Sequence, residues 1–248
     1  MPAPERPVVL LHGCGGSRES TFESTGWLSA LSAAGRSPLA LHLPGHGTRS
    51  ASHDPASYAD LASLVTPELP DGAFDAIGFS LGAKLVLELA MRAPERIGRL
   101  VLGGIGDNVF APESIAEAAA RALETGATPA TPPPVRAFLQ TFEPERNDRL
   151  GIAALLRRPP NPTITEDRLR RISAPVLIVN GAADPVSRFA HRLVSNLRNV
   201  TCVTLPGVDH FGLPAQAAFI RHATDFLKAE AAGQTSVAED TGRHESAT

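Results

Sequence analysis

The sequence predicts a single α/β domain, built on a doubly wound, mostly parallel sheet of about six strands and carrying a short helical lid. Two observations support the sheet: apolar runs recur without polar alternation, and segments with helical character separate several of them. A third supports the lid, because one interval between apolar runs is much longer than the others and is interrupted by prolines. The 248 residues suffice for one large hydrophobic core.

Six apolar runs are the expected strands. They are rich in leucine and β-branched residues, and continuous apolarity is typical of strands that are buried on both faces. The runs cover residues 8–11, 39–43, 74–79, 100–104, 176–180 and 200–205. The helices expected between or after them cover residues 26–34, 58–65, 81–92, 189–197 and 216–228. Because strands and helices alternate, we expect a parallel sheet with right-handed crossovers.

The long interval, residues 105–173, should form the helical lid, inserted into a core made of residues 1–104 and 174–230. Proline-rich segments separate its expected helices, which cover residues 113–124, 135–141, 148–157 and 166–172. After the core, residues 231–248 contain too few apolar side chains to pack against it. We therefore expect a disordered tail there.

Composition and charge exclude several kinds of partner. The formal net charge of -3 provides no basic face for a nucleic acid or an anionic membrane. No apolar run is long enough to span a membrane, and residues 1–6 lack the layout of a secretion signal. Cys14 and Cys202 are the only cysteines, too few and too far apart for a disulfide framework or a structural zinc site. We expect a soluble protein of the cytoplasm.

Ser80 is the first candidate for chemistry, and it lies in the motif Gly-Phe-Ser-Leu-Gly at residues 78–82. An expected strand ends just before it and an expected helix begins just after it. The hydroxyl would therefore project from the carboxyl edge of the sheet, where open α/β folds bind ligands. Backbone N–H groups at the start of the helix would stabilise a developing oxyanion. The alternative interpretation is a serine that only caps this helix.

A serine hydroxyl needs a base and an orienting acid to act as a nucleophile. His210 and Asp184 are the candidates, because each lies in a loop that follows a later expected strand. Taken singly, Asp184 could be a turn residue and His210 an ordinary loop histidine. Together with the serine, in the chain order serine, acid, histidine, they favour a catalytic triad. Weaker alternatives are Asp107 as the acid and Cys14 as the nucleophile.

The stretch Leu-His-Gly-Cys-Gly-Gly-Ser at residues 11–17 is the expected second part of an oxyanion hole. Its glycines permit positive φ and close approach to a bound carbonyl group. The stretch lacks the ending of a P-loop and the spacing of a dinucleotide motif, so we expect no nucleotide cofactor. His12, His42, His46 and His53 also occur early in the chain, but no pair lies at i,i+4 spacing on an expected helix, and we expect no metal site.

Taken together, these motifs resemble the α/β-hydrolase fold superfamily. The matching residues are His12-Gly13, Pro44-Gly45-His46-Gly47, the serine motif, Gly181-Ala182-Ala183-Asp184 and Gly207-Val208-Asp209-His210. The resemblance covers the chain from Val8 to about Lys228. It implies that Ser80 is the nucleophile, Asp184 the orienting acid and His210 the base. It also implies that the backbone N–H groups of Cys14 and Leu81 form the oxyanion hole.

The chain departs from this superfamily at its start. Only seven residues precede the first expected strand, which leaves no room for the antiparallel hairpin that usually stands there. The strand at residues 39–43 would then be an exposed edge of the sheet. Because such an edge can pair with another chain, the expected state is a monomer or a homodimer.

The resulting prediction is a serine hydrolase that cleaves a carboxylic ester of a small, largely apolar substrate through an acyl-enzyme, without a cofactor. Hydrolysis of a lactone, a thioester or a carbon–carbon bond stays open, as does a non-catalytic protein that only binds its ligand. The expected substrate contacts are Gly13, Phe79, Phe138, Phe142 and Phe211. Arginines of the lid could recognise a substrate carboxylate or simply be solvated: Arg136, Arg146, Arg149, Arg157 and Arg158.

Overall fold

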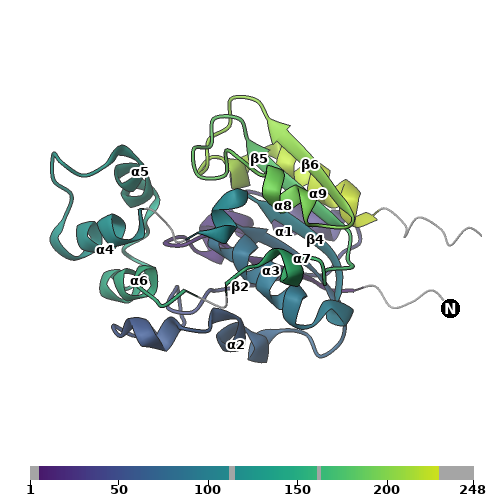
Figure 1. Ribbon diagram of the computed structural model, residues 1–248, viewed down its shortest axis with the longest axis horizontal. Coiled ribbons are helices and arrows are strands. Elements are labelled where there is room, and N and C mark those ends of the chain that lie inside the picture. Colours follow the sequence, from purple (N-terminus) through teal and green to yellow (C-terminus); the bar gives the residue numbers. More distant parts are fainter. Residues whose placement is uncertain (1–5, 112–114, 161–162, 229–248) are drawn as a thin grey trace, which may run out of the picture.

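The computed structural model describes residues 6–111, 115–160 and 163–228, and its centre is a six-stranded parallel sheet (Figure 1). The strands are β1 (Val8–Leu11), β2 (Pro38–Leu41), β3 (Phe74–Phe79), β4 (Ile97–Gly103), β5 (Val176–Gly181) and β6 (Val200–Leu205). Their order is β2-β1-β3-β4-β5-β6, and each neighbouring pair is parallel. This confirms the predicted fold class. The expected tail, residues 231–248, lies outside the described residues.

Helices cover both faces of the sheet. One face carries α2 (Leu61–Val65), α3 (Leu81–Arg92), α7 (Glu166–Leu169) and α8 (His191–Ser195), and the other carries α1 (Trp27–Ala33) and α9 (Ala217–Lys228). Successive residues of a strand point to opposite faces, so each strand supplies both layers. In β1, Val9 and Leu11 pack in the first layer, whereas Val8 and Leu10 pack in the second. All four are fully buried, as their continuous apolarity predicts.

The strand β6 departs from the expectation that the strands are buried on both faces. It is an edge of the described sheet, and of its six residues only Leu205 is buried while three are exposed. An edge strand has a neighbour on one side only, so polar side chains are tolerated on it. The strand β2 is the other edge, as expected, although Ala40 and Leu41 at its end are buried.

Three helices stand apart from the sheet: α4 (Ala116–Thr125), α5 (Pro133–Thr141) and α6 (Arg149–Leu156) (Figure 1). They enclose an apolar cluster of their own, in which Ala120, Val135 and Ile152 are fully buried. The helix α6 begins after Asp148, whose carboxylate accepts hydrogen bonds from two backbone N–H groups of its first turn. The assignment of residues 105–173 to a separate lid stays a prediction. Nowhere in the described part of the chain is a helix long and apolar enough to cross a membrane.

Candidate active site

Ser80 occupies the sharp turn between β3 and α3. Its backbone adopts φ 53° and ψ -112°, and no other non-glycine residue in the described ranges has a positive φ. The turn requires glycine on both sides of the serine. A Cβ atom on Gly78 would lie 2.5 Å from Ala83 Cα, and one on Gly82 would lie 2.0 Å from the Leu11 carbonyl oxygen. The motif therefore packs a strained backbone tightly against its neighbours, as functional turns often do.

The Ser80 side chain makes no capping hydrogen bond to α3, although the residue stands at the N-cap position. Instead, its Oγ lies 3.0 Å from Nε2 of His210. The other ring nitrogen of His210, Nδ1, lies 2.7 Å from Oδ2 of Asp184. The structure thus brings the three side chains together in the relative positions of a serine, base and acid triad.

Asp184 lies in the loop after β5 and is almost fully buried. Its Oδ1 accepts hydrogen bonds from the backbone N–H groups of Val186 and Ser187, and its Oδ2 accepts one from the Ser187 hydroxyl at 2.6 Å. Burial alone would raise the pKa of this carboxyl, but the hydrogen bond and charge of His210 and the two Ser187 contacts outweigh burial and lower the pKa. The carboxylate is therefore ionised at neutral pH.

The sequence left two alternatives open, Asp107 as the acid and Cys14 as the nucleophile, and the structure favours neither. Asp107 Oδ1 accepts a hydrogen bond from the Leu193 backbone N–H at 2.9 Å, in the first turn of α8, and so does not orient His210. Cys14 is half-buried in the glycine-rich loop after β1, and the base lies next to the Ser80 oxygen. The geometry therefore favours the serine over the cysteine as the nucleophile.

The glycine-rich loop at residues 13–17 is held by side chains from two other segments. Among its three glycines only Gly15 has a positive φ, of 77°. The Gly15 backbone N–H donates to Nε2 of His46 at 2.9 Å. On the opposite side, Asn147 Nδ2 donates to the carbonyl oxygens of Gly15 at 3.0 Å and Gly16 at 3.3 Å. These contacts fix the loop that carries Cys14, one of the two predicted oxyanion donors.

Residues of the segment between α5 and α6 thus contact the glycine-rich loop directly. Asn147 is only 5% exposed, and its Oδ1 also accepts a hydrogen bond from the Gly47 backbone N–H at 3.1 Å. Glu143 donates its backbone N–H to the Gly15 carbonyl and accepts a hydrogen bond from the Ser17 hydroxyl at 2.9 Å. Neither role could be predicted from the sequence, because both residues lie in a strongly charged segment, which is typical of solvated surface.

His12, His42 and His46 come together under this loop, with ring centroids 6.0 Å apart for His12 and His42 and 5.1 Å for His12 and His46. Burial lowers the pKa of His46 to about 4 and that of His12 well below its ordinary value. Both rings are therefore neutral at pH 7. His12 Nε2 accepts a hydrogen bond from the Leu43 backbone N–H at 3.1 Å, so these rings support backbone turns.

The fourth early histidine lies elsewhere: His53 Nε2 is 2.8 Å from Asp148 Oδ2 on the exposed side of α6. Within the residues that the structure describes, no group of three or more histidine, cysteine or acidic side chains is arranged to hold a metal ion.

A cavity of about 590 Å³ lies between the triad and the helices α4 and α5. Four of the predicted substrate contacts line it, namely Gly13, Phe79, Phe138 and Phe211. Phe142 is not among the lining residues. Its ring centroid is 6.5 Å from that of Phe138. Leu81 and Cys14, the predicted oxyanion donors, also line this cavity, whose volume suits a small molecule.

The chain belongs to the alpha/beta hydrolase family, whose model matches residues 8–222. The match confirms the resemblance to the α/β-hydrolase fold superfamily that the sequence motifs indicated. Among curated proteins, the chain is similar to an esterase of Mycobacterium tuberculosis, with 34% identity over 99 residues that make up 38% of this chain and 31% of that protein. It is also similar to the pimeloyl-[acyl-carrier protein] methyl ester esterase of Aromatoleum aromaticum, with 41% identity over 97 residues, 39% of this chain and 36% of that protein. The chain spans about a third of the length of these curated relatives.

Solved structures extend the likeness over almost the whole chain. The enol-lactonase of Burkholderia xenovorans LB400 matches with a TM-score of 0.70 and 20% identity. The match covers 92% of this chain and 94% of the enol-lactonase. A hydrolase from Pseudomonas aeruginosa PA01 matches with a TM-score of 0.59 and 25% identity, and covers 92% of each chain. Because the enol-lactonase is only 20% identical to this chain, the likeness to it supports the fold and nothing about function.

Proposed function

We propose that this chain is a serine hydrolase that cleaves a carboxylic ester of a small, largely apolar substrate through an acyl-enzyme. The observation that carries the proposal is the continuous contact from Ser80 Oγ to His210 Nε2 at 3.0 Å and from His210 Nδ1 to Asp184 Oδ2 at 2.7 Å. Both distances are within the range for proton transfer and for orienting a base.

In this mechanism, His210 Nε2 takes the Ser80 proton while Oγ attacks the ester carbonyl carbon. The ionised Asp184 accepts the Nδ1–H of His210, which fixes the tautomer and stabilises the imidazolium. The backbone N–H groups of Leu81 and Cys14 donate to the oxyanion. The alcohol leaves with the proton from His210, and a water molecule, activated by the same base, releases the acid from Ser80.

The class of substrate follows from the lining of the cavity and from the names of the relatives. Apolar side chains, among them Phe79, Ile115 and Phe138, form much of the lining and favour an apolar acyl or alkyl group. Two similar curated proteins are named as esterases, one of them for a methyl ester, and this supports ester cleavage over the other reactions of the fold.

The proposal also includes a cytoplasmic protein that acts as a monomer or homodimer. The two cysteines are not joined in a disulfide, which agrees with a reducing compartment. The edge strand β2 supplies backbone groups with which a second copy could pair. Size-exclusion chromatography with light scattering would measure the oligomeric state.

The test of the proposed activity combines a covalent probe with an ester panel. A fluorophosphonate should label Ser80, and p-nitrophenyl esters of short and medium acyl chains should be cleaved. Ser80→Ala should abolish labelling and lower kcat by about 10⁴-fold or more. Ser195→Ala, at an exposed position in α8, is the matched control and should behave like the unaltered protein. Labelling that persists in Ser80→Ala, or no reaction with the probe or any ester, would exclude the proposal.

A further inference from the structure

The active-site cavity has a polar end, made of side chains that the mechanism above does not use: Ser20, Thr21, Thr25, Thr141 and Glu143. They come from the segment that directly follows the glycine-rich loop and from the end of α5 with the residues after it. Contacts of Glu143 join these two segments. Its Oε2 accepts a hydrogen bond from the Ser17 hydroxyl at 2.9 Å, and the Ser17 hydroxyl lies 3.1 Å from Ser20 Oγ.

The polar end lies close to the nucleophile, which lines the same cavity. A Cβ atom on Gly13 would lie 3.4 Å from Ser80 Cβ, and one on Gly16 would lie 3.4 Å from Thr21 Oγ1. The Gly16 backbone N–H donates to the Gly13 carbonyl oxygen at 3.4 Å. This bond closes a turn, whose end-to-end Cα distance is under about 7 Å. A substrate whose carbonyl group is at Ser80 therefore needs only a short spacer to reach Thr21.

The hydrogen bonds of these side chains decide which ligand group fits. Thr25 Oγ1 donates to the Thr21 carbonyl oxygen at 2.7 Å, and Thr141 Oγ1 donates to the Phe138 carbonyl oxygen at 2.9 Å. A hydroxyl that already donates its hydrogen can only accept a further bond. Glu143 Oε1, as a carboxylate oxygen, also only accepts, and it accepts no hydrogen bond within the described residues. The polar end is therefore complementary to a hydrogen-bond donor.

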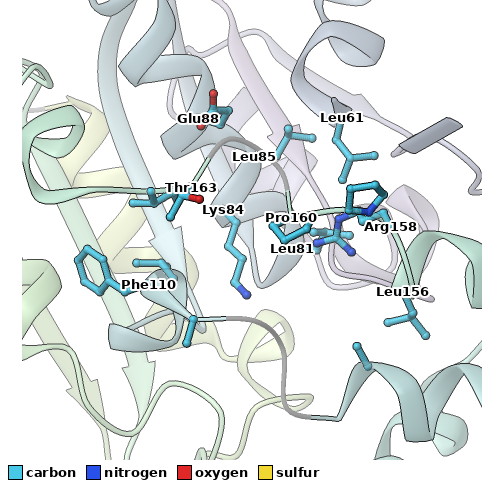
Figure 2. Close-up of a pocket in the computed structure, with 15 residues that line it drawn as sticks. Leu61, Leu81, Lys84, Leu85, Glu88, Phe110, Leu156, Arg158, Pro160 and Thr163 are labelled. Carbon is cyan, nitrogen blue, oxygen red and sulfur yellow. The ribbon is translucent and has the colours of Figure 1, made fainter. Parts of the chain in front are cut away.

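A second cavity, of about 300 Å³, provides a contrast, because its carboxylate cannot meet a ligand (Figure 2). Glu88 lines this cavity, but its Oε1 already accepts hydrogen bonds at 2.6 Å from Arg92 and Arg168, and its Oε2 is sealed from solvent. By contrast, Glu143 Oε1 and Thr21 Oγ1 are both accessible. Like Glu143 Oε1, Thr21 Oγ1 makes no hydrogen bond in the part of the chain that the structure describes.

The Glu143 carboxylate already has a cationic neighbour, so its ligand need not be charged. Arg146 Nε lies 3.2 Å from Glu143 Oε2. The other members of the polar end are hydroxyls, which carry no charge. An ammonium group would lose much of its hydration in a cavity whose lining is otherwise largely apolar, whereas a hydroxyl group has far less hydration to lose. A neutral hydroxyl is therefore the donor that fits best.

We propose that the polar end of the active-site cavity binds a hydroxyl group of the substrate, so that the substrate is a hydroxy ester. The ester carbonyl lies at Ser80, and the hydroxyl donates to Glu143 Oε1 and accepts from the Thr21 hydroxyl. The inference rests on the proposed esterase function and narrows its substrate class. The hydroxyl can belong to the acyl group or to the alcohol, and the experiment distinguishes these two sources.

The experiment measures acid release in a pH-stat from pairs of esters that differ only in a terminal hydroxyl or methyl group. In the acyl series, methyl 6-hydroxyhexanoate is compared with methyl heptanoate, and methyl 8-hydroxyoctanoate with methyl nonanoate. In the alcohol series, 2-hydroxyethyl butanoate is compared with propyl butanoate, and 4-hydroxybutyl butanoate with pentyl butanoate. The measured quantity is the selectivity ratio, kcat/KM for the hydroxy ester divided by kcat/KM for its methyl-terminated partner.

We expect the unaltered protein to favour the hydroxy ester of at least one pair by about 5-fold or more, because a hydrogen bond to a charged group outweighs the burial of one methyl group. The series with the higher ratio identifies the part of the substrate that carries the hydroxyl. A site that hydrogen-bonds a substrate hydroxyl discriminates against the analogue without it, since its own polar groups are then left unpaired.

Two variants locate the effect. In Glu143→Gln the amide oxygen stays with the Ser17 hydroxyl, so an NH₂ group replaces the acceptor Oε1. This variant should lower the selectivity ratio by about 5-fold or more, and Thr21→Val should lower it by about 2–5-fold. Glu145→Gln is the matched control, because Glu145 is exposed and lines neither cavity. It removes the same charge and should leave the ratio unchanged.

The ratio also separates substrate binding from support of the glycine-rich loop. Loss of that support would lower kcat/KM for both esters of a pair alike and would leave the ratio as it is in the unaltered protein. Thermal unfolding of each variant establishes that it is folded. If Glu143→Gln does not fold, Thr21→Val and the ratio of the unaltered protein decide the question.

The outcomes distinguish this inference from the function on which it rests. The hydroxyl site is wrong if methyl-terminated esters are cleaved but no hydroxy ester is favoured, or if Glu143→Gln and Thr21→Val both keep the ratio. It is also wrong if methyl 6-aminohexanoate is cleaved in preference to methyl 6-hydroxyhexanoate, since the polar end then binds a cation. If no ester is cleaved and the fluorophosphonate leaves Ser80 unlabelled, the proposed function itself fails.

Discussion

Asn147, between α5 and α6, allows a direct test of whether this segment holds the glycine-rich loop in place for catalysis. Its side chain accepts a hydrogen bond from Gly47 at 3.1 Å and donates to the carbonyl oxygens of Gly15 and Gly16 at 3.0 and 3.3 Å. Asn147→Leu has similar volume and removes all three bonds. It leaves a backbone N–H and two carbonyl groups without these partners in a site where the side chain is only 5% exposed.

The magnitude follows from these contacts. Each bond contributes about 1 kcal/mol, so Asn147→Leu should destabilise the fold by about 3 kcal/mol and lower Tm by roughly 5–10 °C. Loss of a single oxyanion donor lowers kcat by about 10²–10³-fold. Because the loop also keeps its contact with His46, we expect a partial displacement of the Cys14 N–H and a fall in kcat of about 10–100-fold. KM should change less than about three-fold, since the oxyanion forms only in the transition state.

The assay is steady-state hydrolysis of a p-nitrophenyl ester, at a temperature well below the Tm of every variant. Thr131→Val is the matched control, because Thr131 is a buried lid residue whose hydroxyl accepts a hydrogen bond from the Thr128 backbone N–H at 2.8 Å. It should lower stability without lowering kcat. The reasoning would be refuted if Asn147→Leu had the same kcat as the unaltered protein, or if kcat fell equally in Asn147→Leu and Thr131→Val.

Three further predictions concern the core of the site. Gly82→Ala should destabilise the protein by about 3 kcal/mol or more in urea unfolding, because its Cβ would lie 2.0 Å from the Leu11 carbonyl oxygen, and a loss under about 1 kcal/mol would contradict this packing. Ser187→Ala removes the 2.6 Å hydrogen bond to Asp184 and should lower kcat/KM by about 2–10-fold with the fold intact, whereas unchanged kinetics would mean that this bond does not support the acid. Burial holds the pKa of His46 at about 4, below its ordinary value of 6.5, so the unfolded chain binds the extra proton. The resulting stabilisation is fully present above about pH 6.5 and is lost as the pH falls towards 4, by up to about 3 kcal/mol. Urea unfolding between pH 7 and 4 should show this slope, and His46→Gln should reduce it.

The sheet and the serine turn could be predicted from the sequence because their causes are local. Continuous apolar runs such as residues 74–79 indicate buried strands, and glycines on both sides of Ser80 indicate a tight turn. Asp184 and His210 could be proposed as partners because parallel strands end at the same edge of the sheet. The structure gives the distances between them, which no spacing along the chain could supply.

The supports of the site could not be predicted, because they depend on segments that are distant in the sequence. His46 and Asn147 contact the same glycine-rich loop, although about a hundred residues separate them along the chain. The exposure of β6 depends on its place at the edge of the sheet, and its apolar residues alone gave no sign of it. Phe142 was expected to touch substrate, but it is not among the residues that line the cavity, whereas Phe138 is.

The apolar cluster of α4, α5 and α6 has a consequence for how this chain can be re-engineered. Ala120, Val135 and Ile152 pack in this cluster, against which Cys14 and Phe211 also pack, whereas Ala154 and Leu155 of α6 belong to a core cluster of the sheet. Exchange of α4, α5 and α6 between members of the family would therefore have to preserve their contacts with the core as well as their own cluster. A graft would succeed only if it reproduced the contacts of Asn147 and Glu143 with the glycine-rich loop. Compatibility with a new set of helices would therefore depend on these two positions and on the apolar contacts of Ala154 and Leu155 with the core.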